Sequence, residues 1–159
     1  MTHGEALIIG GTGTISNPVV KRLAGELGWD VWVLNRGNRK IDFPDSVRQI
    51  TADIHDEADV AEKIDGMYFD AVCEFIGFTA RDVERDYRLF AGRTRQYIFT
   101  STASAYHKPA PSHIITEGTS LANPYWQYSR DKRASGRCSG GCRRESRSSF
   151  MGTAAPCGR

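Results

Sequence analysis

Long hydrophobic runs are missing from this chain of 159 residues. Its apolar runs, at 6–9 and 31–34, have the length of a strand and fall far short of the roughly 20 residues that a membrane helix needs. The amino terminus has no basic segment followed by a sustained apolar stretch, so we read no signal peptide. We therefore expect a cytoplasmic protein that does not enter a membrane.

Cysteine is scarce over most of the chain. Cys73 stands alone in residues 1–132, whereas Cys138, Cys142 and Cys157 all fall in the last stretch. No His or Cys pair elsewhere completes a zinc set, and three thiols without a signal peptide make a poor disulfide framework. The sequence therefore predicts no metal site.

The basic character of the chain belongs to its end. Residues 133–159 hold six Arg and one Glu, a net charge of +5, which leaves residues 1–132 with a net charge of −3. Hydrophobic residues make up 40% and charged residues 25%, close to the averages for a soluble globular protein. The length suits one ordinary domain with a single core.

Short apolar runs alternate with amphipathic stretches from residue 6 onward, which indicates βαβ units around a parallel sheet. The expected fold class is α/β, a Rossmann-type doubly wound parallel sheet. We predict a helix that begins near Tyr125, and a helix over 79–93 with Val83, Tyr87, Phe90 and Ala91 on its apolar face. The remaining predicted helices cover 17–28 and 56–64, and the predicted strands lie at 6–10, 30–35, 47–53, 69–77 and 95–102.

A glycine-rich turn, GGTGTIS at 10–16, follows the first predicted strand and opens the first helix. Gly10 permits the tight turn, and Gly13 lets the backbone approach a pyrophosphate that faces the helix N-terminus. Thr14 and Ile15 complete this candidate cofactor site. Ser16 occupies the position of a third glycine, which weakens the match without breaking it; the alternative is a plain strand-to-helix turn.

The end of the second predicted strand has no carboxylate. Enzymes that prefer NAD usually place Asp or Glu there, whereas this chain has Asn35 and Arg36. A guanidinium suits bidentate pairing with a 2′-phosphate, so NADP is favoured over NAD, although Arg36 could equally be a solvated loop residue. Asp53 and Ile54, just past the third strand, are expected near the adenine ring.

Hydroxyl side chains follow the fifth strand in TSTASAY at 100–106, and YSRDK follows at 128–132. On a helix, Tyr128 and Lys132 lie one turn apart on one face. A nearby ammonium favours the phenolate, which makes such a pair useful for moving a proton to or from a substrate oxygen. The pair alone is common; the glycine turn and the hydroxyl-rich strand that precede it give it weight.

Four motifs in this order, GGTGTIS, VLNRGN, STASAY and NPYWQYSRDK, resemble the extended short-chain dehydrogenase/reductases, specifically the NAD-dependent epimerase/dehydratase group that acts on sugar nucleotides and related substrates. The resemblance covers residues 5–132. It implies that Tyr128 is the acid/base, that Lys132 tunes it and binds the nicotinamide ribose, and that Thr102 is the substrate-positioning hydroxyl. Ser101 and Ser104 are neighbours of Thr102 that could be mistaken for it.

The family pattern stops after Lys132. A relative would continue with an apolar helix, a sixth strand and a smaller substrate domain, whereas residues 133–159 are rich in Arg, Gly, Ser and Cys. We expect an NAD(P)-binding domain over 1–132 and a disordered or loosely coiled tail. A nucleic-acid arm and a redox or metal tail using Cys138 and Cys142 are alternatives. The hypothesis we favour is a shift of reading frame just after Lys132.

The predicted function is that of an NADP- or NAD-dependent epimerase, dehydratase or reductase, in which hydride transfer is paired with proton transfer through Tyr128. The expected partners are the dinucleotide and a small-molecule substrate such as a nucleotide sugar. Without the substrate domain, the chain is expected to bind cofactor but turn over no substrate. The runner-up is a nucleotide- or RNA-binding module on the same sheet, whose Arg-rich tail would add salt-dependent affinity.

Overall fold

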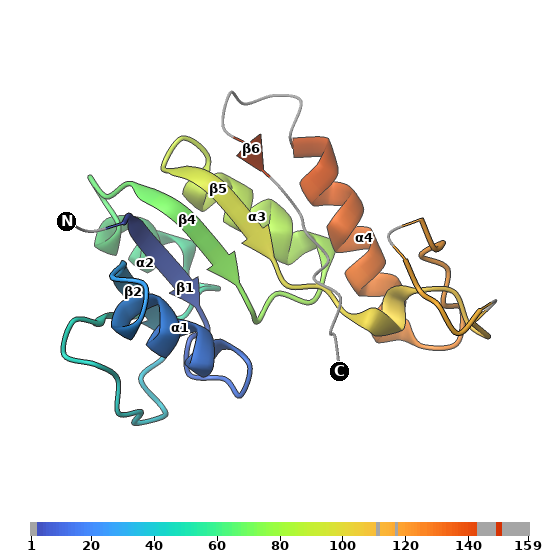
Figure 1. The fold of residues 1–159 in the computed structure, drawn as a ribbon. Coiled ribbons are helices and arrows are strands. Elements are labelled where there is room, and N and C mark those ends of the chain that lie inside the picture. Colours follow the sequence, from blue (N-terminus) through green and yellow to red (C-terminus); the bar gives the residue numbers. More distant parts are fainter. Residues whose placement is uncertain (1–2, 111, 117, 143–148, 151–159) are drawn as a thin grey trace.

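The computed structural model describes residues 3–110, 112–116, 118–142 and 149–150 (Figure 1). Its centre is a six-stranded sheet in the order β3-β2-β1-β4-β5-β6, with every neighbouring pair parallel. This is the Rossmann arrangement, so the predicted fold class is confirmed. The strands are β1 (Glu5–Ile9), β2 (Asp30–Asn35), β3 (Arg48–Thr51), β4 (Phe69–Glu74), β5 (Thr94–Phe99) and β6 (Ser149–Phe150).

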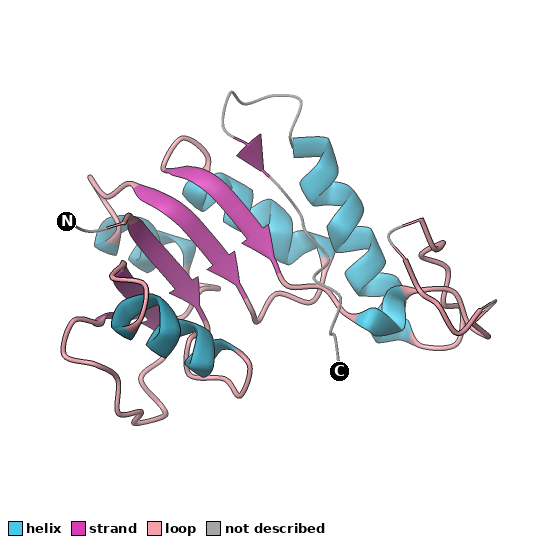
Figure 2. Cartoon of the chain, in the orientation of Figure 1, coloured by secondary structure: helices cyan, strands magenta, loops and turns pink. Residues whose placement is uncertain are grey.

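Helices cover both faces of the sheet, as Figure 2 shows. The alternation of side chains along β1 explains the two layers: Leu7 and Ile9 join the larger core cluster, and Ile8 joins the smaller one on the opposite face. Helices α2 and α3 pack into the larger cluster, and α1 packs into the smaller. The helices are α1 (Ser16–Gly25), α2 (Glu57–Lys63), α3 (Ala80–Phe90), the 3-10 turn η1 (Ala103–Ala105) and α4 (Gln127–Cys142).

Burial along α3 exceeds the prediction at two residues. Val83 and Phe90 of the predicted apolar face are buried and Tyr87 packs against the same core, whereas Ala91, which caps the helix, is partly buried. The charged residues Arg85 and Asp86 are buried as well. They escape prediction because apolar patterning treats charged residues as exposed, whereas these two pair with each other through two hydrogen bonds.

The segment after Lys132 also differs from the prediction. Helix α4 continues to Cys142, so residues 133–142 are helical and not loosely coiled. Ser135 is fully buried and donates to the Asp131 carbonyl oxygen at 2.9 Å, which continues the packed face of the helix. Residues 143–148 and 151–159, including Cys157, lie outside the described residues.

A sixth strand, which we did not predict, pairs with β5. In β6, Ser149 is in register with Gln96 and Phe150 with Tyr97. Backbone hydrogen bonding makes such a pairing, so it needs none of the apolar alternation that sequence patterns detect.

Gly10 has a backbone conformation that favours glycine. Its φ is +77°, and a Cβ added there would lie 2.4 Å from Ile76 Cγ2. We expect Gly10→Ala to lower the free energy of unfolding by about 1–3 kcal/mol, from backbone strain and the clash. Urea unfolding monitored by circular dichroism measures this.

The matched control is Gly25→Ala. Gly25 is the last residue of α1, and a Cβ there would meet no atom within 4 Å. Because alanine is the better helix former, the control should be neutral or more stable by up to ~1 kcal/mol. Equal stabilities of the two variants would contradict the account of the turn.

Candidate cofactor site

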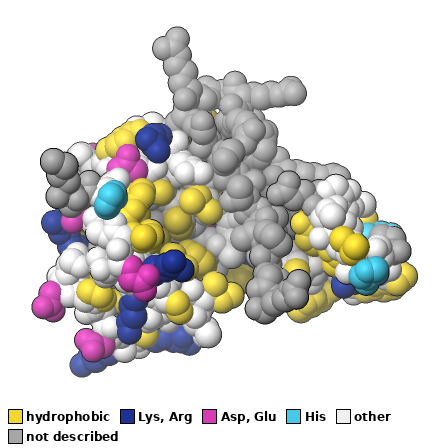
Figure 3. Space-filling view, viewed as in Figure 1, with side chains coloured by type: hydrophobic (Ala, Val, Ile, Leu, Met, Phe, Trp, Pro, Cys, Tyr) yellow, Lys and Arg dark blue, Asp and Glu magenta, His cyan; other side chains and the backbone are white. Residues whose placement is uncertain are grey.

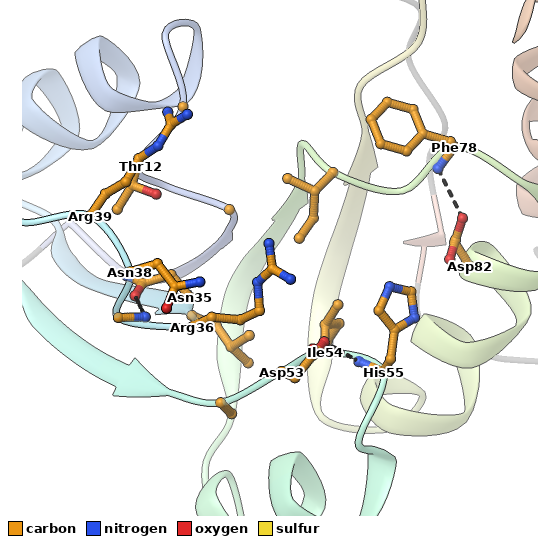
Figure 4. Close-up of a pocket in the computed structure, with 16 residues that line it drawn as sticks. Thr12, Asn35, Arg36, Asn38, Arg39, Asp53, Ile54, His55, Phe78 and Asp82 are labelled. Atoms are coloured by element: carbon orange, nitrogen blue, oxygen red, sulfur yellow. Dashed lines mark hydrogen bonds between the residues drawn. The ribbon is translucent and has the colours of Figure 1, made fainter.

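Two cavities border the carboxyl edge of the sheet. The larger, about 450 Å³, lies between the glycine turn, the end of β2 and the segment after β3. The smaller, about 260 Å³, lies between the same turn, the β4–α3 loop, the end of β5 and α4. They share Gly10, Gly13, Ile76 and Phe78, so they form two halves of one cleft. The larger half is drawn in Figure 4.

The side chain of Ser16 closes the glycine turn. Ser16 occupies the position where the motif has its third glycine. Ser16 is buried, and its hydroxyl donates to the Gly10 carbonyl oxygen at 2.6 Å while accepting from the Gly13 N–H at 3.0 Å. The Gly10 N–H in turn donates to the carbonyl oxygen of Leu34 in β2 at 2.9 Å. Ser16 therefore closes the turn. Thr14 and Ile15, also predicted here, line the smaller cavity.

The end of β2 carries an unsatisfied buried donor. Asn35 accepts from the Gly37 N–H through Oδ1 at 2.7 Å, and no group among the described residues accepts from its buried Nδ2. Buried polar atoms are usually paired, so a ligand in the larger cavity that this residue lines would satisfy it. Arg36 and Arg39 line the same cavity from exposed positions, and Arg36 extends into it in Figure 4.

The segment after β3 closes the far side of the larger cavity. Asp53 accepts from the His55 N–H at 3.0 Å, and Ile54 is buried beside it. Both predicted residues line the cavity, as does His55, which the prediction missed. The first turn of α3 contributes Asp82, which accepts from the backbone N–H of Phe78 and is drawn beside it in Figure 4.

The tyrosine and the lysine of α4 both line the smaller cavity. The ring of Tyr128 contacts two other aromatic rings, with centroid distances of 5.9 Å to Phe78 and 5.0 Å to Trp126. Lys132 is buried and donates from Nζ to the Gly77 carbonyl oxygen at 2.6 Å and to the Thr100 carbonyl oxygen at 2.8 Å. An ammonium has three donors, so these two hydrogen bonds leave one, and the Phe99 ring centroid lies 4.4 Å from Nζ.

Burial lowers the pKa of Lys132 to about 8, against a partial opposing effect of the Glu74 and Asp82 charges. Its ammonium therefore loses its proton at a pH far closer to neutrality than that of an exposed lysine. The shift belongs to a lysine that touches a cavity, which is common at functional sites.

The predicted substrate-positioning hydroxyl has a different environment. Thr102 caps η1, with Oγ1 accepting from the Ser104 N–H at 3.3 Å and lying 3.0 Å from the Ser104 hydroxyl. Ser101 and Thr100 line the smaller cavity, whereas Thr102 is not among its lining residues.

Sequence reasoning also missed a buried carboxyl group behind the cleft. Glu74, at the end of β4, is fully buried, and its Oε1 accepts from the backbone N–H groups of Ile76 and Gly77. Its Oε2 lies 3.6 Å from Arg85. The available signal was a glutamate with apolar residues on both sides, AVC before it and FI after it, which is unusual unless the carboxyl has partners.

Acidic and basic side chains are interspersed on the face of the molecule shown in Figure 3. Among the described residues, no group of three or more His, Cys, Asp or Glu is arranged to hold a metal ion. No helix in the described part of the chain is long and apolar enough to cross a membrane. The side chains of Cys138 and Cys142, proposed for a metal or redox tail, lie outside the described residues.

The sequence of residues 6–155 matches the model of the NAD dependent epimerase/dehydratase family. The chain belongs to this family. The match confirms the resemblance drawn from the motifs and extends it past Lys132. No curated protein sequence matches the chain significantly.

Solved structures, epimerases among them, share the fold. The UDP-Glc/GlcNAc 4-epimerase of Campylobacter jejuni matches with a TM-score of 0.76 and 19% identity over 93% of this chain and 51% of its own. The enzyme WbmG of Bordetella bronchiseptica, determined in complex with NAD, matches with a TM-score of 0.69 and 15% identity over 92% of this chain and 51% of its own. The chain thus spans about half the length of these structures.

The buried carboxyl gives the stability of the family domain a specific pH dependence. Burial, and then the charge of Asp86, raise the pKa of Glu74 to about 8. Between its ordinary pKa of 4.5 and about 8, the folded state binds the proton more tightly than the unfolded state. This contribution to stability is complete below the ordinary pKa and is lost as the pH rises through about 8.

We expect Glu74→Gln to remove that component. From about pH 5 to about pH 8, the free energy of unfolding should fall more steeply for the wild type than for the variant. Urea unfolding at several pH values measures both slopes. Parallel curves would show that Glu74 keeps an ordinary pKa in the folded protein.

Proposed function

We propose that the chain binds a nicotinamide dinucleotide across the cleft, with the adenosine half in the larger cavity and the nicotinamide half in the smaller. The observation that carries this proposal is that Tyr128 and Lys132 line a cavity that shares Gly10 and Gly13 with the larger one. The pyrophosphate would then lie over the glycine turn, beside the start of α1. The unsatisfied Nδ2 of Asn35 supports a polar ligand in the adenosine half.

The adenosine half favours NADP over NAD. Arg36 and Arg39 line it with exposed guanidinium groups, and no carboxylate stands at the end of β2. A 2′-phosphate would gain charge-assisted hydrogen bonds from Arg36 that a plain ribose hydroxyl cannot match. Asp53 and Ile54 are then the candidates to hold the adenine.

The nicotinamide half provides the groups for proton transfer. When bound, the nicotinamide ring supplies hydride transfer. Tyr128 gives or takes the proton at a substrate oxygen, and the third donor of Lys132 binds the ribose of the cofactor. Ser101 lines the cavity, so its hydroxyl is a candidate to hold the substrate oxygen beside Thr102, the next residue in the chain, which the family resemblance favours.

The substrate class we propose is a nucleotide sugar, acted on by a protein of which this chain corresponds to about half. The UDP-N-acetylglucosamine 4-epimerase of Methanobrevibacter ruminantium, determined in complex with UDP-N-acetylmuramic acid, has the same fold at 14% identity and a TM-score of 0.73. This chain covers 52% of that structure.

Cofactor preference is tested by fluorescence titration with NADPH and NADH. We expect saturable binding with NADPH the tighter ligand, and Arg36→Ala should weaken NADPH binding by about tenfold or more while changing NADH binding little. The control is Arg22→Ala, since Arg22 is exposed on α1 in a surface ion pair with Glu26. Absence of saturable binding to either nucleotide would overturn the proposal.

From the lowered pKa of Lys132 we expect cofactor binding to depend on pH. Because the pKa of Lys132 is lowered to about 8, its charge is present below that pH and is lost above it. Wild-type affinity should therefore fall as the pH rises through about 8, whereas Lys132→Met should bind about tenfold more weakly below that pH and show a flatter profile.

Two further variants locate the effect. Tyr128→Phe should bind cofactor nearly as well as the wild type, because the hydroxyl acts on the substrate. Lys21→Met removes an exposed lysine of α1 and should change nothing. A pH profile that is the same in the wild type and in Lys132→Met would remove Lys132 from the binding site.

A further inference from the structure

We propose that Glu74 is a positioning residue for Lys132, holding in place the two backbone carbonyl groups that bind the ammonium; the link to catalysis rests on the proposed function. Glu74 does not itself line either cavity. It acts from behind the cleft, through the β4–α3 loop and through the end of β5.

The first carbonyl group is set by the side chain of Glu74. Its Oε1 accepts from the N–H groups of Ile76 and Gly77, the latter at 2.7 Å, and so folds the chain back over the end of β4. The carbonyl oxygen of Gly77 then accepts from Lys132 Nζ at 2.6 Å. A change in the length of the Glu74 side chain therefore moves this partner of the lysine.

The contact between Glu74 and the loop is close. A Cβ added at Gly77 would lie 3.1 Å from Glu74 Cγ and 3.3 Å from Phe99 Cε2. Gly77 therefore packs closely against the Cγ methylene group of Glu74 and the ring of Phe99 in β5.

The second carbonyl group is set by the backbone of the same residue. The Thr100 N–H donates to the Glu74 carbonyl oxygen at 3.0 Å, which extends the pairing of β4 with β5 past Phe99. The Thr100 carbonyl oxygen accepts from Lys132 Nζ at 2.8 Å. Both partners of the ammonium are thus one hydrogen bond away from Glu74.

To position Lys132, residue 74 needs a hydrogen-bond acceptor on a side chain as long as that of glutamate, and it does not need a negative charge. Burial raises the pKa of Glu74 to about 8, so the neutral acid is the main form near pH 7. The carbonyl oxygen of a neutral acid accepts two N–H groups as a carboxylate oxygen does. Glutamine reproduces that oxygen at the same length, whereas aspartate keeps the carboxyl group one methylene short.

The experiment compares Glu74→Gln with Glu74→Asp. The first readout is the titration midpoint of Lys132, followed by NMR of labelled lysine and assigned by its loss in Lys132→Met. We expect the midpoint in Glu74→Gln to fall only by the loss of the Glu74 charge, which raises the pKa of Lys132. The midpoint in Glu74→Asp should be displaced further, because its shorter side chain cannot fix the Gly77 carbonyl group. Thermal unfolding verifies that each variant is folded, and Glu74→Met replaces the aspartate variant if that one is not.

The second readout is NADPH affinity at pH 7. Glu74→Gln should stay within about twofold of the wild type, and Glu74→Asp should bind about tenfold more weakly. In the Lys132→Met background, Glu74→Asp should cause no further loss, because the two residues act as one unit.

The opposite ranking would overturn the inference: a normal lysine in Glu74→Asp with a displaced one in Glu74→Gln would assign Glu74 a charge role. Equal midpoints in all three proteins would leave Glu74 with a structural role alone and would also overturn it. If the wild type binds neither NADPH nor NADH, the proposed function fails, while the lysine titration still decides the positioning role.

Discussion

The buried ammonium of Lys132 is the contact that ties α4 to the sheet. Taking a charged lysine out of water costs several kcal/mol unless hydrogen bonds replace its hydration. Its two carbonyl partners come from separate connections, the loop after β4 at Gly77 and the end of β5 at Thr100. The placement of those two connections therefore decides whether α4 can dock, and the docked helix presents Tyr128 to the cleft one turn before the lysine.

The strand order explains why distant residues meet at this cleft. The chain builds outward from β1 through β2 to β3, then returns to the other side of β1 with β4. The connections that leave the carboxyl ends of β1 and β4 diverge to opposite sides, which opens a crevice there. Gly10 and Asn35 reach it from one side of the reversal, and Lys132 from the other.

The sequence predicted what depends on position along a strand. Asn35 ends β2, and Gly13 and Asp53 follow the ends of β1 and β3. Parallel strands bring their carboxyl ends to one edge, so the convergence of these residues on one cavity could be foreseen. The burial of Glu74 and Arg85 could not be foreseen, because each ionisable group is tolerated there only through its hydrogen-bond and ion-pair partners. The hydrogen bonds by which Ser16 closes the turn could not be predicted either, since comparison with the motif records Ser16 only as a missing glycine.

The predicted domain boundary after Lys132 follows a change in composition that the secondary structure does not follow. Loss of apolar residues marked the change, yet α4 runs on to Cys142. Once the first turn of a helix has formed, each added residue gains a hydrogen bond, and the unfavourable nucleation step is not repeated. Beyond it, β6 pairs with β5 through the backbone, which side-chain composition does not govern. The change in composition therefore bears on the origin of residues 133–159, which the nucleotide sequence decides, and does not mark the end of the folded domain.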